Sequence, residues 1–207
     1  MALKELARSK AFGGHVVKFS HQAACLGGLD ANFNVYLPPK AAAGGRVPVL
    51  FCLAGLTCTE DNFIQKSGAI RKASQLGIAL VCPDTSPRGA NVEGEDDSWD
   101  FGTGAGFYVD ATEEKWKSHY RMYTYIVDEL PKAVQEELPL VSHDNDRRVV
   151  PVAFSCAGRR GCSCHRKIGP GPLLNNWPLH GWSRCVDNLS QEPRKIQGFL
   201  GSIGLRR

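Results

Sequence analysis

The chain has 207 residues, a length that suits one domain or at most two and allows a sizeable buried core. Its 43% hydrophobic, 22% charged and 9% aromatic residues are ordinary for a globular protein. No apolar run approaches the roughly 20 residues that cross a bilayer, and the first ten residues lack the apolar stretch of a secretory signal. Eight cysteines are too few for a disulfide scaffold. We therefore expect a cytoplasmic protein with reduced thiols and no membrane partner.

The charge is distributed unevenly along the chain. Residues 1–150 hold 16 Lys or Arg against 19 Asp or Glu, whereas residues 151–207 hold 9 against 2. A basic tail can mark a nucleic-acid surface. This tail has no lysine-rich run, no helical period and no interleaving of aromatic and basic residues, so we expect no nucleic-acid partner. The asymmetry instead indicates a change in the kind of sequence near residue 150.

The first part of the chain predicts strands that alternate with helices. Residues 14–19 and 31–37 alternate between apolar and polar side chains, as antiparallel strands do. The apolar runs 47–53 and 78–82 fit buried strands of a parallel sheet. An amphipathic helix is expected between them, over residues 59–76.

The next segment, residues 83–115, is long, acidic and rich in glycine. A connection of this length without regular structure is more often functional than idle. Residues 120–138 predict a helix that Pro131 kinks or splits, and residues 149–154 could form one more strand. Together these elements indicate an α/β fold with a mostly parallel sheet.

Four segments carry a resemblance to one family. They are Leu53–Thr59 (LAGLTCT), Pro83–Gly89 (PDTSPRG), Gly94–Thr112 (GEDDSWDFGTGAGFYVDAT) and Tyr120–Tyr123 (YRMY). In content and spacing they resemble the S-formylglutathione hydrolases, also called the esterase D family. The resemblance implies a three-layer α/β-hydrolase fold and covers nearly all of residues 1–148.

The resemblance also implies a reaction. Members of this family hydrolyse S-formylglutathione to glutathione and formate, the last step of formaldehyde detoxification, and also cleave simple carboxylic esters. They use a Ser–His–Asp triad and no cofactor, and they are often dimeric, so a homodimer is possible here. The nucleophilic serine of such enzymes lies in a G-x-S-x-G elbow between a strand and a helix.

One family segment implies the position of the oxyanion hole. The loop after the expected strand 47–53 would supply a backbone N–H, with Leu56 favoured and Thr57 as its neighbour. The alternative is that this loop is only a tight turn between a strand and a helix. Cys58 matches a family cysteine near the active site. A small buried filler is the alternative role for its thiol.

The long loop supplies further candidates. The resemblance places Trp99, Asp100, Phe107 and Tyr108 close to the substrate cleft. The alternative is a small hydrophobic cluster under a long loop.

The sequence departs from the family where the nucleophile should be. The 207 residues contain no G-x-S-x-G. Ser155 follows a possible strand and has Ala153 and Ala157 at the glycine positions of the elbow, which need very small residues. We nevertheless expect Ser155 to be an ordinary loop serine.

The genetic code suggests a cause. Codons for Trp177-Pro-Leu-His-Gly-Trp182, read from their second base, are compatible with Gly-His-Ser-Met-Gly-Gly, which is the family's elbow. We therefore interpret residues 149–207 as an out-of-frame, truncated and disordered tail that is not homologous to the family. The α/β-hydrolase fold would then be incomplete, because residues 1–148 supply only the N-terminal part of the sheet and the residues after about 150 are irregular.

Without the triad serine, aspartate and histidine, no catalytic residue is retained, and this chain is expected to be inactive. One alternative is a non-catalytic isoform that binds the full-length enzyme, and another is a chain that misfolds. A zinc-binding tail is a further alternative. Its candidate ligands are Cys156, Cys162, Cys164, His165 and Cys185. Their spacing is unlike that of paired zinc ligands, so we expect no metal.

Overall fold

A mixed, seven-stranded β-sheet organises the residues that the computed structural model describes, namely 2–141 and 151–153. The strand order is β1-β2-β3-β5-β4-β6, and β7 also pairs with β4. The strands are β1 (Lys4–Ala11), β2 (Gly14–Ala23), β3 (Leu29–Leu37), β4 (Val47–Leu53), β5 (Ala79–Pro83), β6 (Leu140–Val141) and β7 (Pro151–Ala153). The four strands expected from the sequence correspond to β2, β3, β4 and β5.

The sheet is less parallel than the sequence suggested. Strand β4 runs parallel to β5, β6 and β7, but β1, β2, β3 and β5 pair antiparallel in succession. Short connections join β1 to β2 and β2 to β3, and only antiparallel strands can be joined by such short turns. Phe12 and Gly13 link β1 to β2 with φ of 47° and 78°, the positive values that two-residue hairpins favour. Within the described residues the fold is therefore α/β with a mixed sheet.

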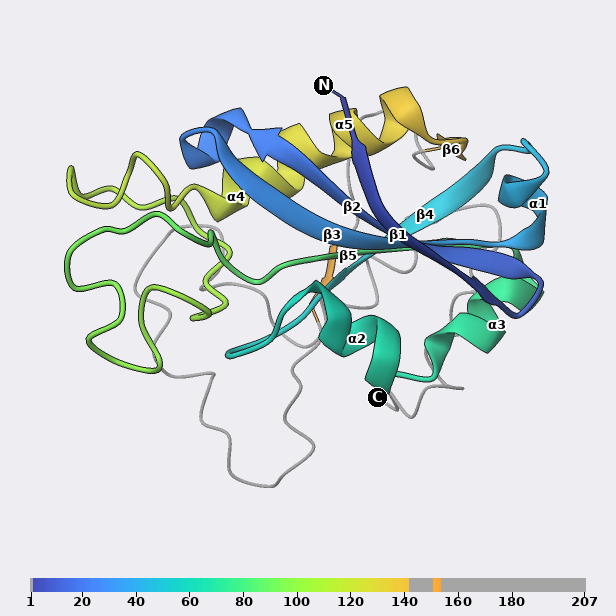
Figure 1. The fold of residues 1–207 in the computed structure, drawn as a ribbon, viewed down its shortest axis with the longest axis horizontal. Coiled ribbons are helices and arrows are strands. Elements are labelled where there is room, and N and C mark those ends of the chain that lie inside the picture. Colours follow the sequence, from blue (N-terminus) through green and yellow to red (C-terminus); the bar gives the residue numbers. More distant parts are fainter. Residues whose placement is uncertain (1, 142–150, 154–207) are drawn as a thin grey trace, which may run out of the picture. The chain divides into compact units, whose positions relative to one another are not determined.

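Helices cover both faces of this sheet (Figure 1). Helices α2 (Glu60–Lys66) and α3 (Ala69–Leu76) lie on one face, and α5 (Leu130–Glu137) lies on the other. On the α5 face, Phe51 and Val81 of the central strands pack in one buried cluster with Leu130 and Val134. The shorter helical elements are η1 (Ala24–Leu26), α1 (Pro39–Ala42), α4 (Met122–Thr124) and η2 (Tyr125–Glu129).

The helix expected over residues 59–76 is two helices. Helix α2 ends at Lys66, and α3 begins after Gly68, whose φ is 66°. Thr59 caps α2: its hydroxyl accepts from the Asp61 N–H at 3.4 Å, and the Asn62 side chain accepts the Thr59 N–H at 2.9 Å. The apolar pattern continues across the break, so periodicity alone could not reveal it.

The second expected helix, over residues 120–138, is present as one uninterrupted helical run over residues 122–137 whose type changes just before Pro131. It consists of α4, a π-helical stretch η2 and then α5, with Pro131 in the first turn of α5. Proline has no N–H to donate and clashes with the preceding turn of a regular helix. A π-helical stretch directly before Pro131 accommodates this mismatch.

Strand β1 was not expected from the sequence. Seven of its eight residues are exposed, so it has none of the apolar alternation that identifies a half-buried strand. Lysine and other charged residues on an edge strand discourage pairing with another chain, and β1 carries Lys4, Glu5, Arg8 and Lys10. The strand considered for residues 149–154 is present as β7.

Several predictions concern residues outside the described part of the chain. They include most of the expected disordered tail, the role of Ser155 and the cysteine cluster of the tail. For residues 151–153 the expectation of disorder is wrong, because they form β7 and pair with β4. Within the described part, no helix is both long and apolar enough to cross a membrane. The cytoplasmic location stays a prediction.

Strand β2 carries a buried histidine, His21, that packs against η2. His21 is 3% exposed, and its ring stacks on Tyr125 with centroids 5.7 Å apart. Its Nε2 lies 3.2 Å from the Tyr125 hydroxyl, whereas its Nδ1 has no hydrogen-bond partner among the described residues. Burial lowers the pKa of His21 because it disfavours the charged imidazolium, and the nearby Glu129 opposes this effect only in part.

This histidine predicts acid sensitivity. Below a pH of about 6.5 the unfolded chain protonates His21 while the folded chain resists, so folding stability falls as the pH falls. Between pH 7.5 and 5.5 we therefore expect the unfolding free energy of the chain to fall more than that of a variant without this imidazole. Urea unfolding of the chain and of His21→Phe at both pH values measures this loss. Equal pH dependence in the two proteins would contradict the prediction.

Candidate active site

Three loops meet beyond the carboxyl ends of β4 and β5. The first is the turn 54–59 after β4, the second is the segment 84–89 after β5, and the third is the glycine-rich part of the long loop, residues 102–108. In open α/β sheets, ligand sites form at this edge, outside the carboxyl ends of the strands.

The turn after β4 has an unusual backbone. The Cys58 N–H donates to the Gly55 carbonyl at 3.2 Å, which places Leu56 and Thr57 at the two central positions of a β-turn. Thr57 has a φ of 61°, and a positive φ at the second central position is the mark of a type II turn, normally occupied by glycine. Such a conformation costs about 1–3 kcal/mol and is retained where the surrounding structure enforces it.

The long loop provides that enforcement. The Thr57 N–H donates to the Gly104 carbonyl at 2.8 Å. The preceding N–H, that of Leu56, has no acceptor among the described residues. Gly106, with a φ of 72°, packs so closely that a Cβ there would lie 3.1 Å from the Leu56 nitrogen. The glycine run therefore lets the long loop lie directly against the turn.

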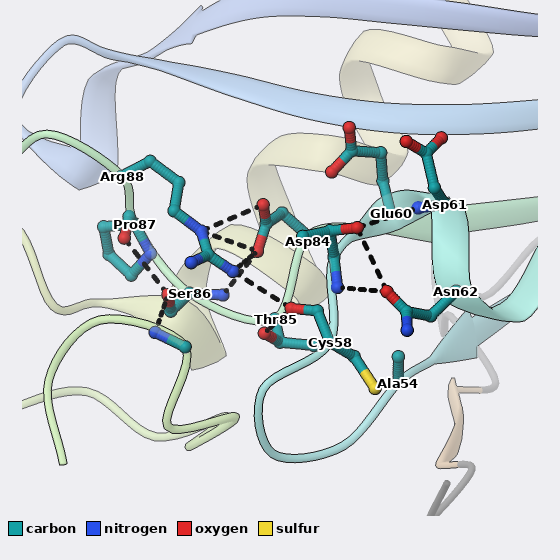
Figure 2. Close-up of polar contacts among 12 residues, drawn as sticks. Ala54, Cys58, Glu60, Asp61, Asn62, Asp84, Thr85, Ser86, Pro87 and Arg88 are labelled. Atoms are coloured by element: carbon teal, nitrogen blue, oxygen red, sulfur yellow. Dashed lines mark hydrogen bonds and ion pairs between the residues drawn. The ribbon is translucent and has the colours of Figure 1, made fainter. Parts of the chain in front are cut away.

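An ion pair between Arg88 and Asp84 lies beside the end of the turn (Figure 2). The Arg88 guanidinium donates to the Asp84 carboxylate through Nε and Nη2, with distances between 2.8 and 3.2 Å. Nη2 also donates to the Cys58 carbonyl at 3.0 Å, and the Thr85 hydroxyl donates to the same oxygen at 2.7 Å. Burial works against the Arg88 charge, but the Asp84 carboxylate outweighs it and raises the pKa of Arg88.

Ser86 connects this support to the long loop. Its hydroxyl oxygen accepts the Gly104 N–H at 2.7 Å and donates to the Pro87 carbonyl at 3.1 Å. The Ser86 N–H donates to Asp84 at 3.2 Å. The PDTSPRG segment therefore positions backbone groups of the site. The sequence motif alone did not reveal this positioning role, because the residues that the segment contacts are distant in the chain.

Cys58 lies at the end of the turn with its side chain buried, 3% exposed. Its carbonyl is the oxygen that Thr85 and Arg88 hold (Figure 2). The anchoring role therefore belongs to the Cys58 backbone. Its role as an active-site thiol stays a prediction.

The four candidates of the long loop are placed differently. The Tyr108 hydroxyl donates to the Ala54 carbonyl at 2.8 Å, directly before the turn. Asp100 accepts a hydrogen bond from Ser98 at 2.5 Å. Trp99 and Phe107 are 72% and 39% exposed. Tyr108 is thus the candidate that a direct hydrogen bond joins to the turn.

The described residues contain no group of three or more histidine, cysteine, aspartate or glutamate side chains placed to hold a metal ion. The contacts of the site are instead backbone hydrogen bonds, hydroxyl hydrogen bonds of Thr85, Ser86 and Tyr108, one ion pair and close glycine packing. This arrangement suits the positioning of a backbone donor.

Known proteins match this chain in sequence and in fold. The family model described as Esterase matches residues 26–151. An S-formylglutathione hydrolase of Mus musculus is 53% identical over 208 aligned residues, covering 97% of this chain and 68% of that protein. One of Bos taurus is 50% identical over 171, covering 83% and 58%. The chain thus spans less than two thirds of the bovine relative's length.

A solved structure agrees with the sequence matches. An S-formylglutathione hydrolase from Agrobacterium tumefaciens superposes with a TM-score of 0.65 and 42% identity, covering 73% of this chain and 52% of that one. The described residues thus have the fold of the α/β-hydrolase-like esterases. The chain belongs to the S-formylglutathione hydrolase family.

The glycine packing yields a stability prediction. Gly102 has a φ of 64°, and a Cβ there would collide with the Glu95 carbonyl. Gly89, at φ 76°, has open space around it and serves as the matched control. We expect Gly89→Ala to cost about 1 kcal/mol from backbone strain alone, and Gly102→Ala to cost about 1–3 kcal/mol more because of the added collision. Chemical denaturation measures both, and equal costs would contradict the packing described.

Proposed function

We propose that the described residues form the oxyanion-binding side of a serine thioesterase site for S-formylglutathione. In the reaction, a serine hydroxyl attacks the formyl carbon, glutathione leaves as the thiol, and water then releases formate from the acyl-serine. The carbonyl oxygen becomes negatively charged at each tetrahedral stage. Preorganised N–H donors aimed at that oxygen supply a large part of the rate acceleration.

The observation that carries this proposal is the Leu56 N–H. It belongs to a turn that a hydrogen bond to Gly104 holds in a strained conformation, and it has no acceptor among the described residues. A donor that is held rigidly and left unpaired is what an oxyanion hole requires. The Thr57 N–H is already bonded to Gly104, so we assign the donor role to Leu56 and a turn-fixing role to Thr57.

The proposed substrate is taken from the names of the relatives. The matched mouse, bovine and Agrobacterium proteins are called S-formylglutathione hydrolases. We propose that the product of this gene hydrolyses S-formylglutathione and also simple carboxylic esters. A homodimer also remains part of the proposal. For the substrate cleft we retain Cys58, Trp99, Asp100, Phe107 and Tyr108 as candidates.

We further propose that this 207-residue chain does not turn over substrate. It contains no G-x-S-x-G, and the codons for residues 177–182 can encode the elbow only when they are read one base out of register. In this interpretation the gene encodes the elbow, but the codons of residues 149–207 are read in a different frame, so the elbow is missing from this chain. A non-catalytic isoform that binds the full-length enzyme is the second candidate.

Hydrolysis assays on four polypeptides test the proposal. They are this chain, the frame-restored product that continues from Arg148 into Gly-His-Ser-Met-Gly-Gly, and that product with Leu56→Pro or Leu56→Ala. Proline removes the N–H, whereas alanine keeps it. The readout is the release of free thiol from S-formylglutathione.

We expect turnover by the frame-restored product and none by this chain. Leu56→Pro should lower kcat about 100-fold to 1,000-fold, as loss of an oxyanion-hole donor does, while Leu56→Ala stays within a few-fold. Full activity of Leu56→Pro would refute the donor assignment. Turnover by this chain that Ser155→Ala abolishes would refute its inactivity and identify Ser155 as the nucleophile.

A further inference from the structure

The long loop lines an open surface cavity of about 230 Å³ that the proposed reaction does not yet use. Its walls include the aromatic side chains of Phe101, Trp116 and Tyr120, together with Thr112 and Glu113. Aromatic rings beside one carboxylate are a combination that suits a positively charged group.

The three rings stand at right angles to their neighbours. Phe101 and Trp116 have centroids 5.1 Å apart and an interplanar angle of 86°, and for Trp116 and Tyr120 the values are 5.3 Å and 82°. Ring faces are electron-rich and attract cations. The ammonium of Lys115, which is not part of the cavity wall, already lies 5.5 Å from the Trp116 ring centroid. Trp116 therefore accepts a cation in this fold.

The surroundings are strongly acidic. Residues 93–117 contain eight Asp or Glu against two basic residues, Lys115 and Lys117. Of these, Glu113 lines the cavity itself. The potential in the cavity therefore favours an ammonium over a carboxylate.

A hydrogen bond to Glu95 holds the Tyr120 side chain in place in the cavity wall. Its hydroxyl donates to Glu95 at 2.8 Å, and the buried Glu95 also accepts the Asn91 N–H at 2.9 Å. Burial and the bond to Glu95 raise the pKa of Tyr120, so its hydroxyl stays protonated. Because this wall is ordered before a ligand arrives, little entropy is lost on binding.

The cavity is also close to the strained turn. Gly102 lines it, and Gly104, two residues further along, accepts the Thr57 N–H. Two residues span at most about 7 Å, and an extended tripeptide spans about 10 Å. A ligand of tripeptide size whose reacting carbonyl lies at Leu56 can therefore reach the cavity with its far end.

We propose that this cavity binds the α-ammonium of the γ-glutamyl end of the glutathione moiety. The proposal rests on the function proposed above, because it takes S-formylglutathione as the substrate. The γ-glutamyl end is the one that carries an ammonium, whereas the glycyl end carries only a carboxylate. The Thr112 hydroxyl on the cavity wall can donate to the carboxylate that adjoins the ammonium.

Binding experiments on the intact chain test this without any turnover. The ligands are tetramethylammonium chloride, S-methylglutathione, and the same thioether with its amine acetylated, each matched in ionic strength. The readout is the indole N–H signal of Trp116 in NMR spectra, assigned by its loss in Trp116→Phe. Glu113→Gln is the test variant. Glu114→Gln is the matched control, since the exposed Glu114 side chain pairs with Lys117 at 2.5 Å.

We expect tetramethylammonium and S-methylglutathione to shift the Trp116 signal and the acetylated thioether to leave it in place. Glu113→Gln should weaken both interactions about threefold, and Trp116→Leu, followed by the remaining loop signals, should weaken them about fivefold. Glu114→Gln should bind like the unmodified chain.

Three results would overturn the proposal in different ways. If tetramethylammonium does not move Trp116, the cavity is not a cation site, whatever the substrate is. If S-methylglutathione binds with an affinity that neither acetylation nor Glu113→Gln alters, the γ-glutamyl assignment is wrong while the proposed function stands. If tetramethylammonium moves Trp116 but S-methylglutathione does not bind, the choice of substrate fails with it.

Discussion

One hydrogen bond, from the Thr57 N–H to the Gly104 carbonyl, determines the geometry of this site. It holds a threonine at a φ of 61°, a conformation that would otherwise relax, and it leaves the adjacent Leu56 N–H without an acceptor among the described residues. The bond joins segments nearly fifty residues apart. A local sequence rule for the turn could not place its partner.

The rest of the site serves to keep these two segments in register. Arg88 holds the Cys58 carbonyl on one side of the turn, and Ser86 holds the Gly104 N–H on the other. Both come from the short segment after β5, so the parallel pairing of β4 with β5 sets the distance between them. The long loop adds close glycine packing at Gly106 and, in our proposal, a cation cavity at its far side.

Apolar patterning was sufficient for the central strands and insufficient elsewhere. The runs at 47–53 and 78–82 are buried, and they became β4 and β5. Strand β1 is exposed and has no apolar pattern, so patterning could not identify it. The apolar pattern runs on past Gly68, so patterning could not identify the break between α2 and α3 either. At the site, the resemblance located the turn and its flanking motifs. It favoured Leu56 over Thr57 as the donor, but it could not reveal that the Thr57 N–H is bonded to Gly104, because that partner is distant in the chain.

We propose that the gene encodes this family scaffold together with a catalytic elbow that the present reading frame misses. Sequencing the transcript across the codons for Arg148 to Trp177 tests it most directly. We expect the dominant message to lack an inserted segment there and to continue into Gly-His-Ser-Met-Gly-Gly. A dominant message that retains every base between those codons would contradict it, and residues 149–207 would then be the true continuation of the protein.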